Sequence, residues 1–385
     1  MRILHILTSP RAEGTPRLVL DWLTVPGHEQ GVLFLTGEPG DLLNDFRRTG
    51  CWLRVEQTLV PGPRKFYAIT RTVRRGVGEF RPDLLIAWPT GFAPWIFLGA
   101  RWGRSRAALI AHAGNPPGTG WFDRYLMTWL CLWTTALCRG RLVACSRYVQ
   151  GLFRAIPLVP ASRVGFAYNA LQAAAIARRA EAARALRPAG DPFRALMVAT
   201  LEAHKDHATL LRAARLLQDR GGAMEIWLAG AGSLEADLKA LVAELGVGAT
   251  VTFLGARRDV PELLGRSDVF VLSTTPREGF GIVLFEAMAA GLPIIASAVD
   301  PVREVLADGR WGTMVEVGNA EALAAALAAA AGPDYHGSAS ERRAYATAFT
   351  PERMIRDYLK EAHLGAATAG GGLVLPPATP SPTRR

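Results

Sequence analysis

The chain has 385 residues, of which 50% are hydrophobic, and a formal net charge of +10. This length is too great for one ordinary hydrophobic core and fits two domains. Four cysteines are too few for a disulfide framework, and the longest nearly apolar stretch, residues 125–138, falls short of the ~18 residues of a membrane span. These features exclude a small disulfide-stabilised secreted protein. The first apolar run is also too short for a signal peptide, so we expect a cytoplasmic protein.

The positive charge is concentrated in the first half of the chain. Residues 1–180 carry 23 Lys and Arg against 10 Asp and Glu, together with eight of the ten tryptophans. Anionic lipids attract Lys and Arg by roughly 1 kcal/mol per residue near the surface, and tryptophan favours the same interface. One interpretation is peripheral contact with an anionic membrane, at the inner face of the plasma membrane. A soluble domain with arginines outside and tryptophans inside is the other. No nucleic-acid-binding motif accompanies the charge, so we expect no nucleic acid partner.

Short apolar runs alternate with helical segments in residues 1–185. The runs are almost continuously apolar, which is typical of a parallel sheet covered on both faces. The candidate strands span residues 2–7, 31–36, 84–88, 107–113, 141–146 and 164–169. The stretch 178–192 is polar and ends in Pro and Gly, as linkers do, so we place a domain boundary near residue 185.

The same alternation starts again in residues 186–345. A leucine stripe over 234–245 predicts a helix, with Ser233 as N-cap and Gly246 after its end. Two doubly wound α/β domains follow from this pattern. A final helix is expected in 346–364, and residues 365–385, rich in Gly, Pro, Ser and Thr, are expected to be disordered. The second-half strands span residues 193–200, 224–230, 250–255, 268–273, 292–297 and 312–316.

The most informative motif is PREGFGIVLFEAMAAGLPIIAS, residues 276–297. A strand-like run precedes Glu278-Gly279-Phe280-Gly281, and strong helix formers follow, so the order is strand, glycine turn, helix. Such a helix start presents unpaired N–H groups and partial positive charge to an anion. Carboxylates accept hydrogen bonds from sugar hydroxyls, as the acidic residue of dinucleotide-binding folds does for a ribose. The motif therefore predicts a site for an anionic sugar compound.

These residues resemble the retaining, nucleotide-sugar-dependent glycosyltransferases of family 4. Two glutamates with seven residues between them, Glu278 and Glu286, are the signature of that family, and the similarity extends over roughly residues 195–330. The resemblance implies the GT-B fold, an α/β architecture in which two Rossmann-like, doubly wound parallel-sheet domains face a central cleft. It also implies an acceptor-binding domain in 1–185, a nucleotide-sugar-binding domain in 186–345, and a last helix that crosses back to the first domain.

The resemblance also assigns site residues. In the second domain, Lys205 and the turn Gly279-Phe280-Gly281 should meet the donor diphosphate, Glu278 the hexose hydroxyls and Glu286 the ribose. In the first domain, His112 should face the donor sugar, and Glu278, Lys205 and His112 form the catalytic set. No metal and no cofactor are implied, the nucleoside-diphosphate sugar being a co-substrate. The remaining donor-binding candidates are Gly14, Thr15, Thr200, Gly230 and Gly232.

Structural alternatives exist for three of these assignments. Lys205 could be an exposed loop lysine, Glu286 a helix glutamate with only a structural partner, and His112 a structural histidine at a strand end. The sequence also departs from the family, because Thr200 stands where many relatives carry an arginine. His204, His207 or an arginine from elsewhere could compensate.

The expected activity is hexosyl transfer to a hydroxyl acceptor, a saccharide or lipid-linked saccharide, in the synthesis of cell-surface polysaccharide or glycolipid. A binding or scaffold protein without turnover is an alternative, favoured by Thr200 and by the altered element YNALQ around Asn169. A nucleotide-sugar epimerase of related fold is a further one. The sequence names neither the sugar, the base, the acceptor nor the linkage.

Overall fold

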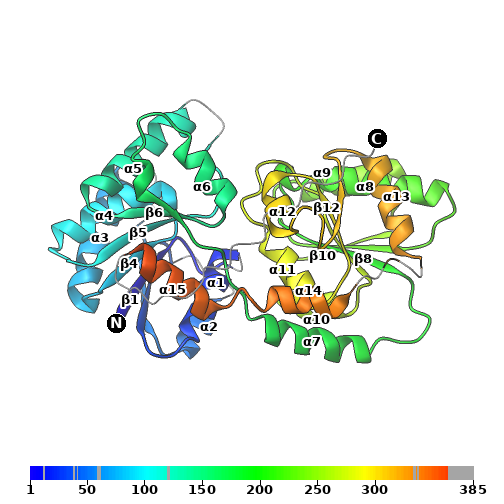
Figure 1. Ribbon diagram of the computed structural model, residues 1–385, viewed down its shortest axis with the longest axis horizontal. Helices are drawn as coiled ribbons and strands as arrows, with labels where there is room; N and C mark the ends of the chain where they lie inside the picture. Colours follow the sequence, from blue (N-terminus) through cyan, green and yellow to red (C-terminus); the bar gives the residue numbers. More distant parts are fainter. Residues whose placement is uncertain are drawn as a thin grey trace. The chain divides into compact units, whose positions relative to one another are not determined.

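The computed structural model describes residues 1–362 except 12–13, 38–39, 41, 59–61, 119–121, 333–334 and 336–337 (Figure 1). The tail expected to be disordered lies outside the described residues. Contacts within the chain divide the described residues into two units, Met1–Leu171 with residues 350–362, and Gln172–Phe349. Each unit contains one parallel sheet, so the prediction of two doubly wound α/β domains is confirmed.

The first unit has a seven-stranded sheet in the order β3-β2-β1-β4-β5-β6-β7, with every pair parallel. Its strands are β1 (Arg2–Leu7), β2 (Glu29–Phe34), β3 (Trp52–Val55), β4 (Leu84–Ala87), β5 (Ala108–Ala113), β6 (Arg141–Ala144) and β7 (Val164–Phe166). Its helices are α1 (Gly14–Leu23), α2 (Leu43–Arg48), α3 (Arg64–Phe80), α4 (Ala93–Trp102), α5 (Thr128–Leu137), α6 (Arg147–Arg154) and α15 (Pro351–Glu361). Short turns of other helix types are η1 (Thr90–Phe92), η2 (Phe122–Met127) and η3 (Ala161–Arg163).

The second unit has a six-stranded parallel sheet in the order β10-β9-β8-β11-β12-β13. Its strands are β8 (Arg194–Val198), β9 (Glu225–Ala229), β10 (Val251–Gly255), β11 (Val269–Leu272), β12 (Ile294–Ser297) and β13 (Thr313–Val315). Its helices are α7 (Ala173–Ala185), α8 (His207–Asp219), α9 (Glu235–Leu245), α10 (Val260–Gly265), α11 (Ile282–Ala289), α12 (Asp300–Val305), α13 (Ala320–Ala330) and α14 (Ala339–Ala346), and η4 (Ala203–Lys205) is a 3₁₀ turn.

In each sheet, the order in which successive strands are added reverses at one place. This place lies between β1 and β4 in the first unit and between β8 and β11 in the second. The central strands are almost entirely buried, which explains their continuous apolar sequence. In open parallel sheets, ligands bind outside the carboxyl ends of the strands at such a reversal. The topology therefore directs attention to the loops after these four strands.

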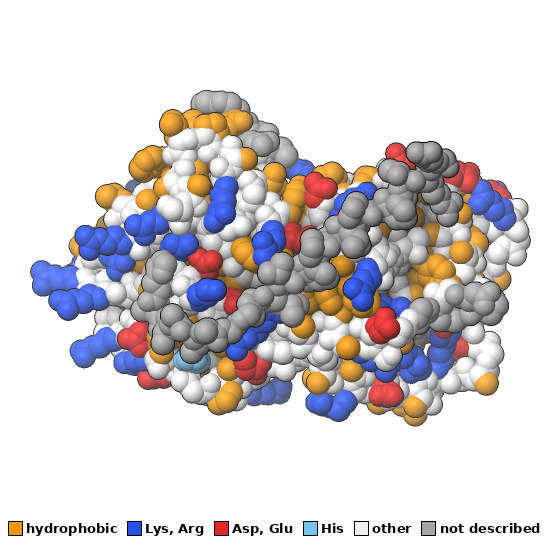
Figure 2. Space-filling view, in the orientation of Figure 1, with side chains coloured by type: hydrophobic (Ala, Val, Ile, Leu, Met, Phe, Trp, Pro, Cys, Tyr) orange, Lys and Arg blue, Asp and Glu red, His pale blue; other side chains and the backbone are white. Residues whose placement is uncertain are grey.

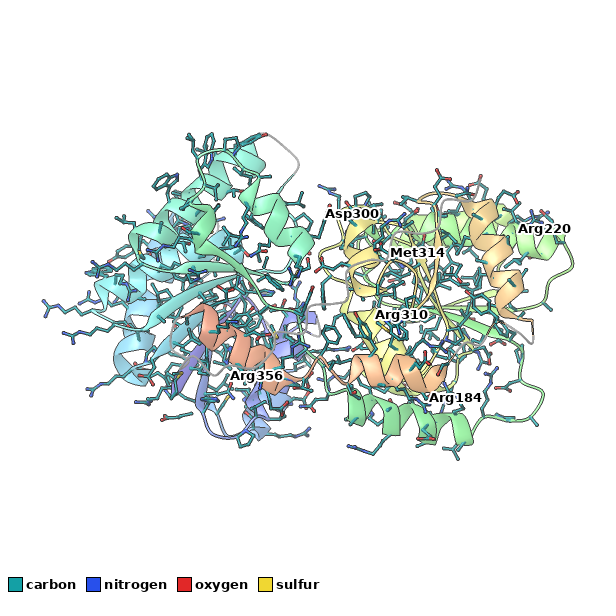
Figure 3. All side chains as sticks on the ribbon, in the orientation of Figure 1. Arg184, Arg220, Asp300, Arg310, Met314 and Arg356 are labelled. Carbon is teal, nitrogen blue, oxygen red and sulfur yellow. The ribbon has the colours of Figure 1, made fainter. Side chains whose placement is uncertain are left out.

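Helix α7 belongs to the second unit, although the sequence places the domain boundary after it, near residue 185. Its buried alanines and Ile176 pack on α10 and α11. Arg184, labelled in Figure 3, donates a hydrogen bond to the carbonyl oxygen of Ala290 at the end of α11 (3.3 Å). The polar composition that suggests a linker comes from the exposed face of this helix.

Helix α15 packs against α1 and β6 of the first unit. Trp22 donates its indole N–H to the sulfur of Met354 (3.2 Å), and Arg141 pairs with Glu361 (2.9 Å). Tyr358 is completely buried. The last described helix is thus part of the core of the first unit.

Two local sequence predictions have different outcomes. Helix α9 is present and ends at Gly246, whose left-handed conformation (φ +66°) explains the glycine. Ser233 is not its N-cap, however, because the helix starts two residues later. The Ser233 amide and hydroxyl instead donate to the carboxylate of Glu202 (2.9 and 2.8 Å).

The cysteines are free thiols, and Cys131, Cys138 and Cys145 are buried, as small core residues are expected to be. Burial raises the pKa of Cys131 to about 12, so this thiol stays protonated and unreactive at neutral pH.

Candidate functional site

Two loops of the second unit meet at the carboxyl edge of the sheet, beyond β8 and β11. The carbonyl oxygen of His204 accepts hydrogen bonds from the Thr275 amide (3.0 Å), the Thr274 hydroxyl (3.0 Å) and the Thr275 hydroxyl (3.2 Å). The Thr274 amide in turn donates to the hydroxyl of Ser297 at the end of β12 (2.9 Å). These bonds hold the loop carrying Lys205 against the loop carrying Glu278.

Lys205 and Glu278 form an ion pair, with 2.5 Å between Nζ and Oε2. Their side chains keep only 16% and 8% of their exposure, so the pair is largely shielded from water. Burial alone would raise the pKa of Glu278, but the Lys205 ammonium and the neighbouring amides outweigh it and hold the pKa below its usual value. Glu278 is therefore ionised at neutral pH. The side chain of Lys205 is largely buried in this pair, which excludes the alternative of an exposed loop lysine.

The second carboxylate oxygen of Glu278 lies in the backbone turn before α11. Oε1 accepts the amides of Gly279 (3.0 Å), Phe280 (3.4 Å) and Gly281 (3.1 Å). Gly281 has φ +71°, a left-handed conformation that favours glycine and aligns these amides at the helix start. We call the three amides the α11 nest.

The Glu278 carboxylate thus occupies the position that the sequence assigns to a donor phosphate. The nest and the Lys205 ammonium both point at one anion, which here is the protein's own side chain. An incoming diphosphate can use the same positive groups only if Glu278 moves aside. The geometry is that of an anion site closed by an internal carboxylate.

Gly230 and Gly232 follow β9 and pack against the loop after β8. A Cβ at Gly230 would overlap the carbonyl oxygen of Ala199, and one at Gly232 would overlap that of Leu201. Leu201 also donates its amide to Ala231 (3.1 Å). The two glycines therefore fix the course of the loop that leads to Lys205, which gives them a structural reason beside their predicted donor contact.

Glu286 lies one turn inside α11 and is half-buried, and Thr200 is exposed on the loop after β8. Neither His204 nor His207 supplies the positive charge of the arginine that Thr200 replaces. Burial and the charge of Lys205 lower the pKa of His207 to about 4 and also lower that of His204, so both are neutral at pH 7. Arg277 is exposed and close enough to lower the pKa of His204.

His112 is the last but one residue of β5 in the first unit and is buried. Its Nδ1 lies 2.6 Å from the hydroxyl oxygen of Tyr358, and its ring lies 4.7 Å from that of Trp88. Burial lowers the pKa of His112 to about 3 and raises that of Tyr358 well above its usual value. Both groups are neutral at pH 7.

The contact with Tyr358 suits the tautomer of His112 that carries its ring proton on Nε2. The buried Tyr358 hydroxyl needs an acceptor, and Nδ1 of a neutral imidazole supplies one when the ring proton is on Nε2. The Nε2 atom lies on the side of Gly114, where a Cβ would approach it to 3.1 Å. In that tautomer, His112 presents an N–H donor toward the loop after β5.

A cavity of about 380 Å³ adjoins His112 in the first unit. Thr15 at the start of α1 lines the same cavity, so the structure brings together two of the predicted residues. Gly14 is exposed and does not line it, and no close approach requires a glycine there. Further lining residues are Trp88, Thr90, Asn115, Met127, Thr128 and Cys131.

A second cavity, of about 470 Å³, lies in the other unit at the amino ends of β12 and β13. Arg310 and Met314, labelled in Figure 3, line it together with Arg303, Tyr335 and Arg342. This is the edge of the sheet opposite to Lys205 and Glu278. Ligand sites of doubly wound sheets lie at the carboxyl edge, so we do not place the functional site here.

Sequence reasoning missed the residues that hold the site together. Thr274, Thr275 and Ser297 join the two loops of the second unit, and Tyr358 fixes the His112 ring. The hydroxyl residues Thr274 and Thr275, just after β11, could have indicated hydrogen bonds between the two loops. No local pattern links Tyr358 to His112, because 246 positions separate them.

Comparison with known proteins identifies the family of the second unit. Residues 178–332 match the family model described as glycosyl transferases group 1. Over residues 178–332 this chain belongs to the group 1 glycosyltransferases. Lys205, Glu278, Glu286 and the α11 nest all lie in the matched segment, whereas Gly14, Thr15 and His112 lie outside it.

Curated relatives of this segment are named as sugar transferases. The amylovoran biosynthesis glycosyltransferase AmsK of Erwinia amylovora is 33% identical over 143 residues, 35% of each chain. The phosphatidyl-myo-inositol mannosyltransferase of Mycolicibacterium smegmatis is 39% identical over 128 residues, 33% of this chain and 32% of the relative. The chain therefore aligns with about a third of the length of the curated relatives that it matches.

The fold likeness covers nearly the whole chain. HepE of Anabaena, solved in complex with UDP and glucose, superposes with a TM-score of 0.78 at 18% identity, over 94% of this chain and 98% of that one. With the two parallel sheets, this likeness establishes the GT-B fold for this chain. Among the described residues, no helix is both long and apolar enough to cross a membrane.

Proposed function

We propose that this chain transfers a hexose from a nucleoside-diphosphate sugar to a hydroxyl acceptor, with retention of configuration at the anomeric carbon. The observation that carries the proposal is the convergence of Lys205, Glu278 and the α11 nest at the strand reversal of a group 1 domain. Sugar transfer needs stabilisation of a departing diphosphate and a grip on the hexose. In this site, Lys205 and the α11 nest supply positive charge for the diphosphate, and Glu278 supplies a carboxylate for the hexose.

The diphosphate takes the place of the Glu278 carboxylate in the α11 nest and pairs with Lys205. As the bond from the anomeric carbon to the diphosphate oxygen breaks, its electron pair passes to the diphosphate, and the ammonium and amides stabilise that charge. The displaced Glu278 carboxylate then accepts hydrogen bonds from hexose hydroxyls. The acceptor oxygen bonds to the anomeric carbon on the face that the diphosphate leaves, and the acceptor's hydroxyl proton passes to the departing diphosphate oxygen.

Other residues complete the donor site in this proposal. Glu286 accepts the ribose hydroxyls, and the loops with Thr200, Gly230 and Gly232 border the nucleotide. In the first unit, Gly14 and Thr15 approach the donor phosphates. His112 donates a hydrogen bond to a sugar oxygen through Nε2–H, which the Tyr358 contact favours. The positive groups are Lys205 and backbone amides, so we propose that transfer requires no metal and no cofactor.

The proposed acceptor is a saccharide or a lipid-linked saccharide of the cell envelope. Relatives named for amylovoran, lipopolysaccharide core and phosphatidyl-myo-inositol support this class. HepE was solved with UDP-glucose, which supports a nucleoside-diphosphate sugar as donor. We further propose that the protein works in the cytoplasm, in peripheral contact with the inner face of the plasma membrane.

A panel of nucleoside-diphosphate sugars, each incubated with lipid-linked saccharides, tests the function. We expect diphosphate release with one donor series, and a product whose anomeric proton shows the donor's configuration by NMR. Turnover should continue in EDTA, since the proposed positive groups are part of the protein. Inverted configuration would contradict retention, and EDTA inhibition reversed by a divalent cation would contradict metal independence.

A binding protein without turnover is the alternative, and the observation in its favour is Thr200 together with the neutral His204 and His207. The same panel separates the two. A donor that raises the melting temperature by mass action but is never consumed, with any acceptor, would establish the binding protein and contradict the transferase.

The Nε2–H tautomer of His112 predicts a difference between two substitutions. The amide nitrogen of His112→Gln can replace Nε2–H, whereas that of His112→Asn occupies the position of Nδ1. We therefore expect His112→Gln to retain at least tenfold more kcat/KM than His112→Asn. Because the pKa of His112 is about 3, the imidazole stays neutral above that pH and adds no acid limb to the wild-type profile between pH 5 and 8.

Tyr358→Phe supplies the control for this prediction. It removes the hydroxyl that fixes the tautomer, so the ¹⁵N shifts of His112 should change from one protonated nitrogen at Nε2 to a mixture. Equal activity of the Gln and Asn variants, or a wild-type ring protonated at Nδ1, would contradict the assigned donor role.

A further inference from the structure

Helix α5 and the preceding turn expose a row of large apolar side chains. Leu126, Leu130, Trp133 and Leu137 recur at intervals of four, three and four residues, which places them on one helix face. Their exposed fractions are 41%, 39%, 55% and 80%. Met127, exposed by 39%, extends the row. We call these five residues the α5 crest.

The opposite face of α5 is buried through Cys131, Leu132 and Thr135. No charged residue occurs between positions 125 and 138, and the polar residues of α5 are three threonines, of which Thr128 and Thr135 are buried. A helix of that kind is normally buried on every side, in a protein core or in lipid. The crest is therefore a surface that lacks the polar groups of a permanently solvated helix.

The apolar surface continues over the neighbouring helices of the same unit. Helix α4 packs on both α5 and α3, and it exposes Leu98 and Trp102, while α3 exposes Tyr67. Eight of the thirteen exposed large hydrophobic residues of the described chain belong to these helices and the turn before α5. Patches of this kind mark sites of association.

A basic border accompanies the crest. Helix α3 contains Arg64, Lys65, Arg71, Arg74 and Arg75 against one acidic residue. The four arginines are exposed and Lys65 is half-buried. The Arg74 guanidinium lies 4.5 Å from the ring centre of Trp102. Figure 2 shows hydrophobic side chains gathered over α5 and Lys and Arg side chains along the adjacent edge of the unit.

We propose that the α5 crest inserts into the headgroup layer of an anionic lipid bilayer, with the basic residues of α3 contacting the lipid phosphates. Leucine and tryptophan on an amphipathic surface, beside cations with long flexible stems, suit the apolar boundary and the charged plane of a membrane interface. The cations would reach a lipid plane over a broad edge. A small anion would use only one or two of them.

The position of α5 links this surface to the proposed function, on which this part of the inference rests. Met127 belongs to the crest and also lines the cavity beside His112, and Thr128 and Cys131 line the same cavity from the next turn. A membrane at the crest would therefore lie next to this cavity. A lipid-linked saccharide could reach it without leaving the bilayer.

Co-sedimentation of the full chain with vesicles tests the surface. We expect binding to phosphatidylcholine vesicles that contain phosphatidylglycerol, and at least tenfold weaker binding to phosphatidylcholine alone. The combined substitutions Leu130→Ser, Trp133→Ser and Leu137→Ser should reduce the vesicle partition coefficient at least tenfold. These side chains are exposed, so circular dichroism and the melting temperature should remain those of the wild type.

Leu186→Ser with Val317→Ser is the matched control, since both residues are exposed apolar side chains of the second unit. It should bind vesicles like the wild type. Arg71→Gln with Arg75→Gln should weaken binding to the anionic vesicles only. Unchanged binding of the crest variant, or no binding of the wild type to any vesicle, would overturn the proposal. The assay contains no sugar donor, so its failure is independent of a failure of the transferase proposal.

Discussion

Glu278→Gln is expected to reduce sugar transfer by at least a hundredfold and, at the same time, to tighten the binding of the nucleoside diphosphate. The loss of transfer is of the order that removal of one transition-state contact produces, ~10² to 10³. The gain in diphosphate affinity has a separate cause. The carboxylate that occupies the α11 nest and neutralises Lys205 is itself a competitor for the diphosphate.

Removing that negative charge frees two positive groups for the diphosphate. Two like charges about 4 Å apart repel by up to about 4 kcal/mol at the effective dielectric of a protein surface, so a tenfold decrease in Kd is a modest expectation. Glutamine can still accept a nest amide through its carbonyl oxygen, which preserves the turn. Isothermal titration with the diphosphate product, beside a transfer assay, measures both effects.

Glu262→Gln is the matched control. Glu262 belongs to the same unit and pairs with Arg179 at the surface, with 2.7 Å between the charged groups. An exposed pair contributes about 0–1 kcal/mol, so this variant should show wild-type transfer and wild-type diphosphate affinity. Near wild-type transfer by Glu278→Gln would remove Glu278 from the reaction, and unchanged diphosphate affinity would contradict the closed anion site.

Lys205→Met is expected to abolish diphosphate binding and to destabilise the fold. The diphosphate loses the one ammonium that lies in the site, and Glu278 is left as a buried carboxylate without its ion-pair partner. Breaking a buried pair on one side costs about 3 kcal/mol in the free energy of unfolding. The α11 nest still bonds Oε1, which keeps the variant folded at room temperature. Urea unfolding at pH 7 measures the loss.

The double variant Lys205→Met with Glu278→Gln separates the two effects. It removes the unpaired charge, so it should recover most of the stability while remaining unable to bind the diphosphate strongly. A coupling energy of about 2 kcal/mol between the two positions is expected for a shielded pair. Additive losses of stability would show that the coupling energy between Lys205 and Glu278 is small. Full diphosphate affinity in Lys205→Met would exclude the lysine from the site.

Much of the fold could be predicted from the sequence because its signals are local. The apolar runs of β1, β8 and β11 and the leucine stripe of α9 each reflect burial of one element. Gly281 marks the start of α11 because only that backbone conformation opens the nest. Resemblance to a family supplied Lys205 and Glu278 together, although 73 positions separate them.

The parts that could not be predicted depend on contacts between distant segments. The domain division falls before α7 because Ala and Ile side chains of that helix pack on α10, which its arginine-rich surface conceals. The Lys205–Glu278 pair joins two loops whose residues lie 73 positions apart. His204 and His207, which the sequence suggested as replacement cations, are neutral because burial lowers their pKa.

The order of diphosphate affinities among three proteins tests the central claim most directly. Isothermal titration of the wild type, Glu278→Gln and Lys205→Met with the diphosphate of the active donor series should place Glu278→Gln as the tightest binder and Lys205→Met as the weakest. That order follows from one anion site shared by a carboxylate and a diphosphate. Equal affinities in all three proteins, or tighter binding by Lys205→Met than by the wild type, would contradict it.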